Sequence, residues 1–281
     1  HYQNLKRIIA AVGGKAKRIN VIMPFLYESR QHKRSSRESL DCALALQELT
    51  HMGVDNIITF DAHDPRVQNA IPLSGFETVR PTYQFVKGLL DRYDDLIIDS
   101  DHMMAISPDE GATERAVYLA NVLNLDMGMF YKRRDYTRVV NGRNPIVAHE
   151  FLGSSVEGKD VIILDDMISS GDSILDVAKQ LKSRNAKRIF AAATFGLFTN
   201  GLDKFDEAYE SGLIDGVLTT NLIYQTPELL SRPYYINCDM SKYVALMIDT
   251  LNHDGSISDI LDPSERIQVC VEEYKKAHGQ L

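Results

Sequence analysis

The chain has 281 residues, of which 44% are hydrophobic, so it is long enough to bury the core of one or two domains. Its 31 Lys and Arg side chains and 39 Asp and Glu side chains give a net charge of −8, which argues against nucleic acid as a partner of the whole molecule. The three cysteines lie far apart and predict free thiols in a reducing compartment. Since the sequence has no apolar run of about 18–20 residues and no signal-peptide pattern, we expect a cytoplasmic protein that binds no membrane.

The first predicted element is a helix-like stretch, NLKRIIAAVG, that begins at Asn4. The chain starts at His1 rather than at a methionine, and this stretch follows almost at once. We therefore expect a longer protein, with an N-terminal domain that is truncated at its start in this sequence.

Short apolar runs then alternate with amphipathic stretches along the chain. The apolar runs predict strands at 19–24, 55–60, 103–107, 126–131, 160–164, 188–194 and 216–220. Helices are predicted between them, at 38–52, 82–92, 112–124, 173–184 and 203–211. Strands that are apolar throughout, each followed by a helix, indicate parallel sheets flanked by helices, so we predict an α/β fold.

Local patterns set the boundaries in this prediction. Ser35 and Glu38 have the spacing of a capping box, which starts a helix at residue 38, and Gly53 ends that helix. The stretch NAIPLSGFETVRP (69–81) is interpreted as irregular and separates two similar halves. We therefore expect domains at 1–80 and 81–264, followed by an amphipathic C-terminal helix at 265–281 whose apolar face is Ile267, Val271 and Tyr274.

The most informative motif is VIILDDMISSGDS (161–173), in which two acids and a turn of small residues follow an apolar strand. Because ligands collect at the carboxyl ends of strands in open α/β sheets, we expect Asp165 and Asp166 at the ligand-binding edge. The small residues after them let backbone N–H groups approach an anion at the N-terminus of the next helix. The alternative is a simple strand–turn–helix connection with Ser and Asp caps. The paired acids and the hydroxyl groups around the glycine favour a phosphosugar site.

Four further polar segments follow predicted strands. Arg30 and Lys33, in the basic run 27–37, would meet a polyphosphate, unless this run is only a solvated loop. His63 lies between acids in FDAHD (60–64) and would bind a metal-bound phosphate, although a single histidine is more often structural. Asp109 in SPDEGATERA (107–116) is either a ligand-binding acid or a helix cap. The basic stretch YKRRDYTR (131–138), with no regular element predicted before residue 160, would close over a polyanionic transition state or remain a surface loop.

These motifs resemble a known family. DDMISSGDS (165–173) is similar to the phosphoribosyl-diphosphate-binding motif of type I phosphoribosyltransferase folds. Taken together and in order, RQHKR, GVDNIITFDAH, SPDEGA, YKRR and IILDDMISSGDS resemble the ribose-phosphate diphosphokinases, over roughly residues 5–260. The resemblance implies two phosphoribosyltransferase-like domains and a homo-oligomer based on dimers, with hexamers common in the family.

The resemblance also implies an activity and a set of site residues. The family transfers the β,γ-diphosphoryl group of ATP, bound with Mg²⁺, to the C1 hydroxyl of ribose 5-phosphate, which gives 5-phosphoribosyl 1-diphosphate and AMP. The residues implied to bind ribose 5-phosphate are Asp165 and Asp166 for the ribose hydroxyls and Ser169, Ser170, Gly171, Asp172 and Ser173 for the phosphate. Those implied for the rest of the site are Arg30 and Gln31 for ATP, His63 and Asp109 for the Mg²⁺-bound diphosphate, and Lys132 and Arg134 as the basic catalytic pair.

The sequence departs from the family pattern at several positions. Ser169 takes a place often held by an acid, Asp172 a place where glycine is usual, and Glu110 a place that prefers a small residue. The stretch after FDAH also lacks the expected further acid or histidine. Two alternatives therefore stay open: a non-catalytic regulatory paralogue of the synthetase, and a nucleobase phosphoribosyltransferase, which would leave RQHKR and FDAH unexplained.

Overall fold

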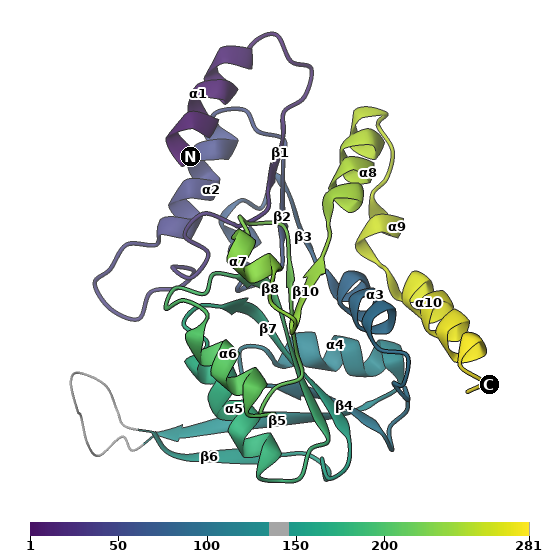
Figure 1. The fold of residues 1–281 in the computed structure, drawn as a ribbon. Coiled ribbons are helices and arrows are strands. Elements are labelled where there is room, and N and C mark those ends of the chain that lie inside the picture. Colours follow the sequence, from purple (N-terminus) through teal and green to yellow (C-terminus); the bar gives the residue numbers. More distant parts are fainter. Residues whose placement is uncertain (135–145, 281) are drawn as a thin grey trace. The chain divides into compact units, whose positions relative to one another are not determined.

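The computed structural model describes residues 1–134 and 146–280, and it divides into two compact units, His1–Pro81 and Thr82–Leu281. Both units combine parallel strands with helices (Figure 1). The predicted α/β class with parallel sheets flanked by helices is therefore confirmed.

The first unit is built on a small parallel sheet. Its strands lie in the order β1 (Asn20–Met23), β2 (Asn56–Phe60) and β3 (Gly75–Val79). The helical elements are α1 (Tyr2–Val12), α2 (Asp41–His51) and the short 3-10 helix η1 (Pro65–Ala70). The expectation that 69–81 is wholly irregular was wrong, because β3 pairs with β2. Only Phe76 and Val79 are buried in this edge strand, so its sequence carries little of the apolar pattern that reveals a strand.

The start of α2 also differs from the prediction. The helix begins at Asp41 rather than at residue 38. The backbone N–H of Ser35 does donate to the Glu38 carboxylate at 2.9 Å, but this contact closes an exposed turn before the helix. Ser35 and Glu38 thus make the contact expected of a capping box, but they do not cap α2, because both residues precede its first turn.

The second unit contains a sheet in the order β10-β9-β8-β7-β4-β5-β6. The strands are β4 (Met103–Ser107), β5 (Asp126–Arg134), β6 (Ile146–Leu152), β7 (Asp160–Ile168), β8 (Arg188–Gly196), β9 (Gly216–Thr220) and β10 (Tyr235–Cys238). Neighbours run parallel except β5 and β6, which are antiparallel. The expectation of no regular element before residue 160 was wrong, since β6 occupies 146–152, and β10 was also not predicted.

Helices cover both faces of this sheet (Figure 1). In β7, Ile162 and Leu164 join the core formed with α3 (Thr82–Arg92), α4 (Thr113–Leu123) and α10 (Ser264–Ala277). Val161 and Ile163 point the other way, toward α5 (Asp172–Lys182) and α6 (Asp203–Glu210). The alternation of strand side chains thus builds two cores from one continuous apolar run. The remaining helices are α7 (Pro227–Leu230), α8 (Ser241–Asn252) and α9 (Ser258–Leu261).

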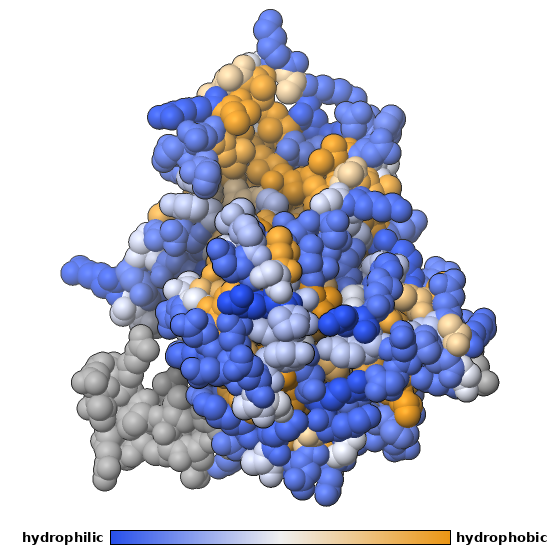
Figure 2. All heavy atoms as spheres, in the orientation of Figure 1, coloured by the Kyte–Doolittle hydropathy of each residue, from blue (hydrophilic) through white to orange (hydrophobic). Residues whose placement is uncertain are grey.

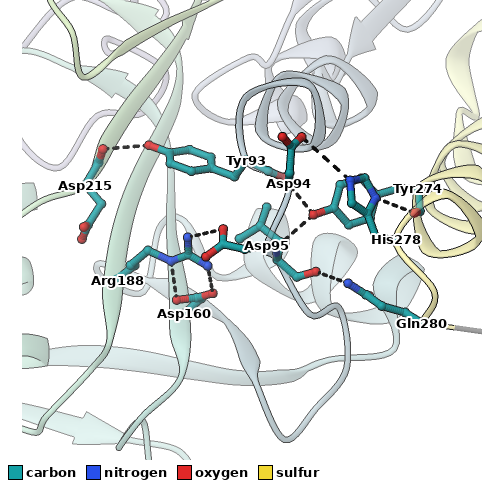
Figure 3. A network of polar contacts seen from close by, with 10 residues as sticks. Tyr93, Asp94, Asp95, Asp160, Arg188, Asp215, Tyr274, His278 and Gln280 are labelled. Carbon is teal, nitrogen blue, oxygen red and sulfur yellow. Dashed lines mark hydrogen bonds and ion pairs between the residues drawn. The ribbon is translucent and has the colours of Figure 1, made fainter.

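The last helix is fixed to the second unit by a polar network (Figure 3). Ile267, Val271 and Tyr274 are buried, as the amphipathic pattern predicts. The Tyr274 hydroxyl donates to the Tyr93 carbonyl at 2.8 Å and accepts the Leu96 N–H at 3.0 Å, so α10 holds the connection between α3 and β4. Among the described residues, no helix has the length and apolar character needed to cross a membrane.

Candidate active site

The centre of the candidate site is the carboxyl end of β7. This strand runs to Ile168, so Asp165 and Asp166 lie inside it rather than after it as the sequence pattern suggested. On the β8 side β7 stays paired as far as Ile168, but on the β4 side the pairing stops at Ile163. Asp165 and Asp166 therefore lie beyond the paired end of β4.

The loop after β4 carries Asp109 to this place. The Oδ1 atom of Asp109 accepts hydrogen bonds from the backbone N–H of Gly111 at 3.0 Å and of Ala112 at 3.3 Å. The Ser107 hydroxyl donates to the Asp109 carbonyl at 2.6 Å. Asp109 thus closes a turn before α4. It does not cap the helix, because the N-cap residue of α4 is Ala112, which has no side-chain cap hydrogen bond. The turn fixes the position of the Asp109 carboxylate.

The three carboxylates influence one another. Asp166 is buried, at 3% exposure, and its backbone N–H donates to Oδ1 of Asp165 at 2.8 Å. Burial, the Asp166 carboxylate and, more weakly, the Asp109 carboxylate raise the pKa of Asp165 well above its usual value. The site therefore holds a repelling pair of acids that sugar hydroxyl donors or a cation would relieve.

The loop after β7 is shaped to receive an anion. Gly171 has φ +85°, and a Cβ atom there would lie 2.4 Å from the Phe205 ring, so only glycine fits this position. The helix α5 starts at Asp172, whose backbone N–H donates to the Ser170 hydroxyl at 3.4 Å. The N–H groups of a first helical turn have no carbonyl partner inside the helix, so they favour an anion at this end. Loop and helix start together form the kind of cradle that binds a phosphate.

The chain after β8 supports this loop from one side. The backbone N–H of Leu197 donates to the Ile168 carbonyl at 2.8 Å, and that of Thr199 to the Ser169 carbonyl at 2.9 Å. Further along, Lys204 forms an ion pair of 2.6 Å with Asp172. The Ser170 hydroxyl also donates to Asp172, at 3.0 Å. Sequence reasoning missed Lys204 and Phe205, because they lie more than thirty residues downstream of the loop and no local pattern links them to it.

In the first unit, Arg30 and Gln31 follow β1. Arg30 is exposed and lines a pocket of about 400 Å³ whose other lining residues include Tyr2, Leu5, Met23, Phe25 and Tyr27. Figure 2 shows apolar side chains gathered over the part of this unit that contains α1 and β1. The Gln31 amide donates to the Ser39 carbonyl at 2.9 Å, so Gln31 holds together the loop that precedes α2.

His63 lies in a polar cluster just after β2. The His63 and His32 rings form a T-shaped pair with their centroids 5.3 Å apart, and His32 Nδ1 lies 3.0 Å from Asp64 Oδ2. Arg66 Nε donates to Asp64 at 2.9 Å, and this contact holds the pKa of the Asp64 carboxyl well below its usual range. His32 was not predicted as a site residue, since its contact with residues 63 and 64 appears only once β1 and β2 pair.

Lys132 and Arg134 lie in β5, where their backbones pair with His149 and Ile146 of β6. The remainder of the predicted basic loop, residues 135–145, lies outside the described residues. In the described part of the chain, no group of three or more His, Cys, Asp or Glu side chains is arranged so that it could hold a metal ion. His63 and Asp109 belong to different units.

Comparisons with known proteins match both units. Residues 79–221 match the profile of the phosphoribosyl transferase domain, and residues 1–53 match that of the N-terminal domain of ribose phosphate pyrophosphokinase. The ribose-phosphate pyrophosphokinase of Shewanella oneidensis is 30% identical over 263 residues, which cover 91% of this chain and 78% of that protein. That of Mycoplasma genitalium is 32% identical over 214 residues, which cover 75% of this chain and 60% of the relative.

A solved structure shows the same fold. The crystal structure of phosphoribosylpyrophosphate synthetase from Mycobacterium smegmatis aligns with a TM-score of 0.75 at 24% identity, covering 90% of this chain and 78% of that one. The match to the Mycoplasma genitalium protein spans only 60% of that relative's length.

Proposed function

Because the chain belongs to the ribose-phosphate pyrophosphokinase family, we propose that it transfers the β,γ-diphosphoryl group of ATP to the C1 hydroxyl of ribose 5-phosphate. The C1 oxygen attacks the β-phosphorus, the bond from this phosphorus to the oxygen of the α-phosphate breaks, and AMP leaves. The C1 hydroxyl proton passes to solvent. The products are 5-phosphoribosyl 1-diphosphate and AMP.

The observation that carries this proposal is the β7–α5 segment of the second unit. Asp165 and Asp166 repel each other at the end of β7, so ribose hydroxyl groups that donate to them would relieve the repulsion. The loop of Ser169, Ser170, Gly171, Asp172 and Ser173 follows directly and would take the 5-phosphate on its backbone N–H groups. Sugar and phosphate would thus be held by neighbouring parts of one strand–loop–helix segment, which orients the C1 hydroxyl.

The ATP half of the reaction is assigned by family resemblance. Arg30 and Gln31 would contact ATP, and Lys132 and Arg134 would supply positive charge where negative charge develops during the transfer. Arg30 lies beside the largely apolar pocket of the first unit, whose aromatic side chains could pack against a flat base. We therefore assign ATP binding to domain 1–80 and ribose 5-phosphate binding to domain 81–264.

Mg²⁺ is the cofactor that the family resemblance implies. The absence of an all-protein metal cage among the described residues agrees with the usual binding of this ion, through one or two side chains plus waters and substrate phosphates. We assign His63 and Asp109 to the Mg²⁺ ion. Asp165 lies close to Asp109, and carboxylate oxygens such as theirs are the ligands that Mg²⁺ prefers. When bound, the ion would neutralise charge on the diphosphate.

The assembly and location are part of the same proposal. We expect a homo-oligomer based on dimers, which light scattering of the purified protein would measure. The three cysteines form no disulfide, and Cys42 and Cys238 are buried, which suits a reducing cytoplasm.

The test is AMP release by the full-length protein. We expect AMP to form only when ATP, Mg²⁺ and ribose 5-phosphate are all present, and we expect Asp166→Asn to abolish it. If the wild-type protein forms no AMP but co-purifies with an active synthetase, the catalytic proposal is wrong and a regulatory role replaces it.

A further inference from the structure

One acidic side chain lies at an unfavourable place in the proposed phosphate loop. Asp172 is the first residue of α5, where the helix N-terminus favours an anion. A carboxylate at this position repels a phosphate that binds to the same N–H groups. The loop therefore needs a compensating positive charge if it is to bind the 5-phosphate of a sugar.

Lys204 supplies that charge. Its Nζ lies 2.6 Å from Asp172 Oδ1, and Ser170 donates to the other oxygen of the same carboxylate at 3.0 Å. The ion pair lowers the pKa of Asp172 and raises that of Lys204. Asp176 and Glu207 add to the negative potential around Lys204, and Lys179 lies near Asp172 as a second cation. Asp172 is thus neutralised within the loop region itself.

The position of Lys204 is fixed by its neighbour in α6. Phe205 is fully buried, and its ring occupies the space beside Gly171 where a Cβ atom would otherwise lie. The same two-residue segment therefore shapes the loop, through Phe205, and neutralises it, through Lys204. The Lys204–Asp172 pair itself is half exposed, at 52% and 55%, so it adds little to stability, and its main effect is on the local electrostatic potential.

We propose that Lys204 is a positioning residue for phosphate binding: it neutralises Asp172 so that the loop accepts the 5-phosphate of the sugar. This proposal rests on the proposed function of the loop. The acid that Lys204 neutralises stands at a place where the family resemblance leads us to expect glycine.

The test is a charge cycle on the full-length protein, with ribose 5-phosphate binding measured by calorimetry. Lys204→Met leaves Asp172 unpaired, so we expect the dissociation constant to rise about tenfold, as for one unit charge uncovered close to a doubly charged anion at an exposed site. In turnover the KM for ribose 5-phosphate should rise and kcat should not change. Asp172→Asn alone should tighten binding, and the double variant Lys204→Met/Asp172→Asn should return affinity to near the wild-type value.

Salt dependence and a matched pair separate this role from a structural one. The effect of Lys204→Met should shrink as the salt concentration rises, with an unchanged melting temperature. Lys87 and Asp91 in α3 form an ion pair of the same length, 2.6 Å, with similar exposure, 49% and 62%. Lys87→Met should therefore leave ribose 5-phosphate binding unchanged.

Four results would overturn parts of this account. If Lys204→Met binds ribose 5-phosphate as the wild type does, Lys204 does not position the phosphate. If the double variant binds as weakly as Lys204→Met, Lys204 contacts the ligand itself and the neutralisation proposal is wrong. Inorganic phosphate serves as the second probe. If the protein binds phosphate in a way that depends on Lys204 but does not bind ribose 5-phosphate, the proposed function is wrong and the role of Lys204 is supported. If the wild-type protein binds neither ligand, both proposals are wrong.

Discussion

At the scale of single residues, the site combines a repelling acid pair with neutralised neighbours. Burial and the neighbouring Asp166 carboxylate raise the pKa of Asp165, whereas the ion pair with Lys204 lowers the pKa of Asp172. Retaining such repulsion costs stability, and active sites commonly retain it because the ligand relieves it. The two acidic positions therefore have different roles. Asp165 is assigned to ligand binding, whereas Asp172 is already paired with Lys204.

Replacing Asp165 with Asn should stabilise the protein and weaken ribose 5-phosphate binding. The folded-state pKa of Asp165 is raised, so its ionisation opposes folding at any pH above the unfolded value of about 3.9. We expect Asp165→Asn to raise the free energy of unfolding by about 1 kcal/mol at pH 7, and this gain should vanish as the pH falls toward 4. Denaturant titrations at several pH values measure it. The control is Asp176→Asn, an exposed acid on α5, and a destabilised Asp165→Asn would contradict the account.

Arg66 should matter for stability at neutral pH but not in acid. It holds the pKa of Asp64 below its usual range, so the stabilisation is present above the unfolded pKa of about 3.9 and is lost as the pH falls through the folded value. We expect Arg66→Met to lower the melting temperature at pH 7 and the difference from wild type to narrow steadily below pH 4. A difference that stays constant from pH 7 to pH 3 would show that Arg66 acts by packing instead.

At the scale of elements, the sequence predicts the strands that are apolar throughout. The runs at 103–107 and 216–220 match β4 and β9 to the residue, because a strand buried on both faces needs an unbroken apolar sequence. Three edge strands were not predicted in this way, although a fourth edge strand, β1, was predicted at 19–24. β3, β6 and β10 lie at the edges of their sheets, where fewer buried side chains are needed, and β6 follows residues whose basic and glycine content resembles a loop.

The site could be predicted only as far as it is local in sequence. Asp165, Asp166 and the loop to Ser173 form one continuous segment, so strand, loop and helix start can be identified together. The contacts of Lys204 with Asp172 and of His32 with Asp64 join residues about thirty positions apart. Such contacts depend on which strands become neighbours in the sheet, and no local pattern in the sequence predicts the strand order.

The C-terminal helix is an element whose attachment can be tested directly. The Tyr274 hydroxyl is bonded to both the Tyr93 carbonyl and the Leu96 N–H (Figure 3). Tyr274→Phe leaves these two backbone groups without this partner, so we expect a loss of about 1–3 kcal/mol in unfolding free energy. Tyr224→Phe is the control, because the Tyr224 side chain is exposed, at 82%. Equal stabilities of the two variants would show that the hydroxyl does not secure α10.

At the scale of the whole molecule, the proposed reaction needs both units. The first carries Arg30, Gln31 and His63, and the second carries Asp109, the acid pair and the phosphate loop. The two family profiles also match different units. The N-terminal profile matches residues 1–53 of the first unit, and the transferase profile matches residues 79–221, which lie almost entirely in the second. The transfer itself depends on positioning and charge neutralisation more than on a covalent intermediate.

The most direct test of this account is the identity of the products, observed by ³¹P NMR in one reaction of the full-length protein with ATP, Mg²⁺ and ribose 5-phosphate. Transfer of the diphosphoryl group predicts AMP and a diphosphate ester at C1 of the sugar, formed in equal amounts. ADP together with a singly phosphorylated sugar, or ATP that stays unconsumed, would contradict the account.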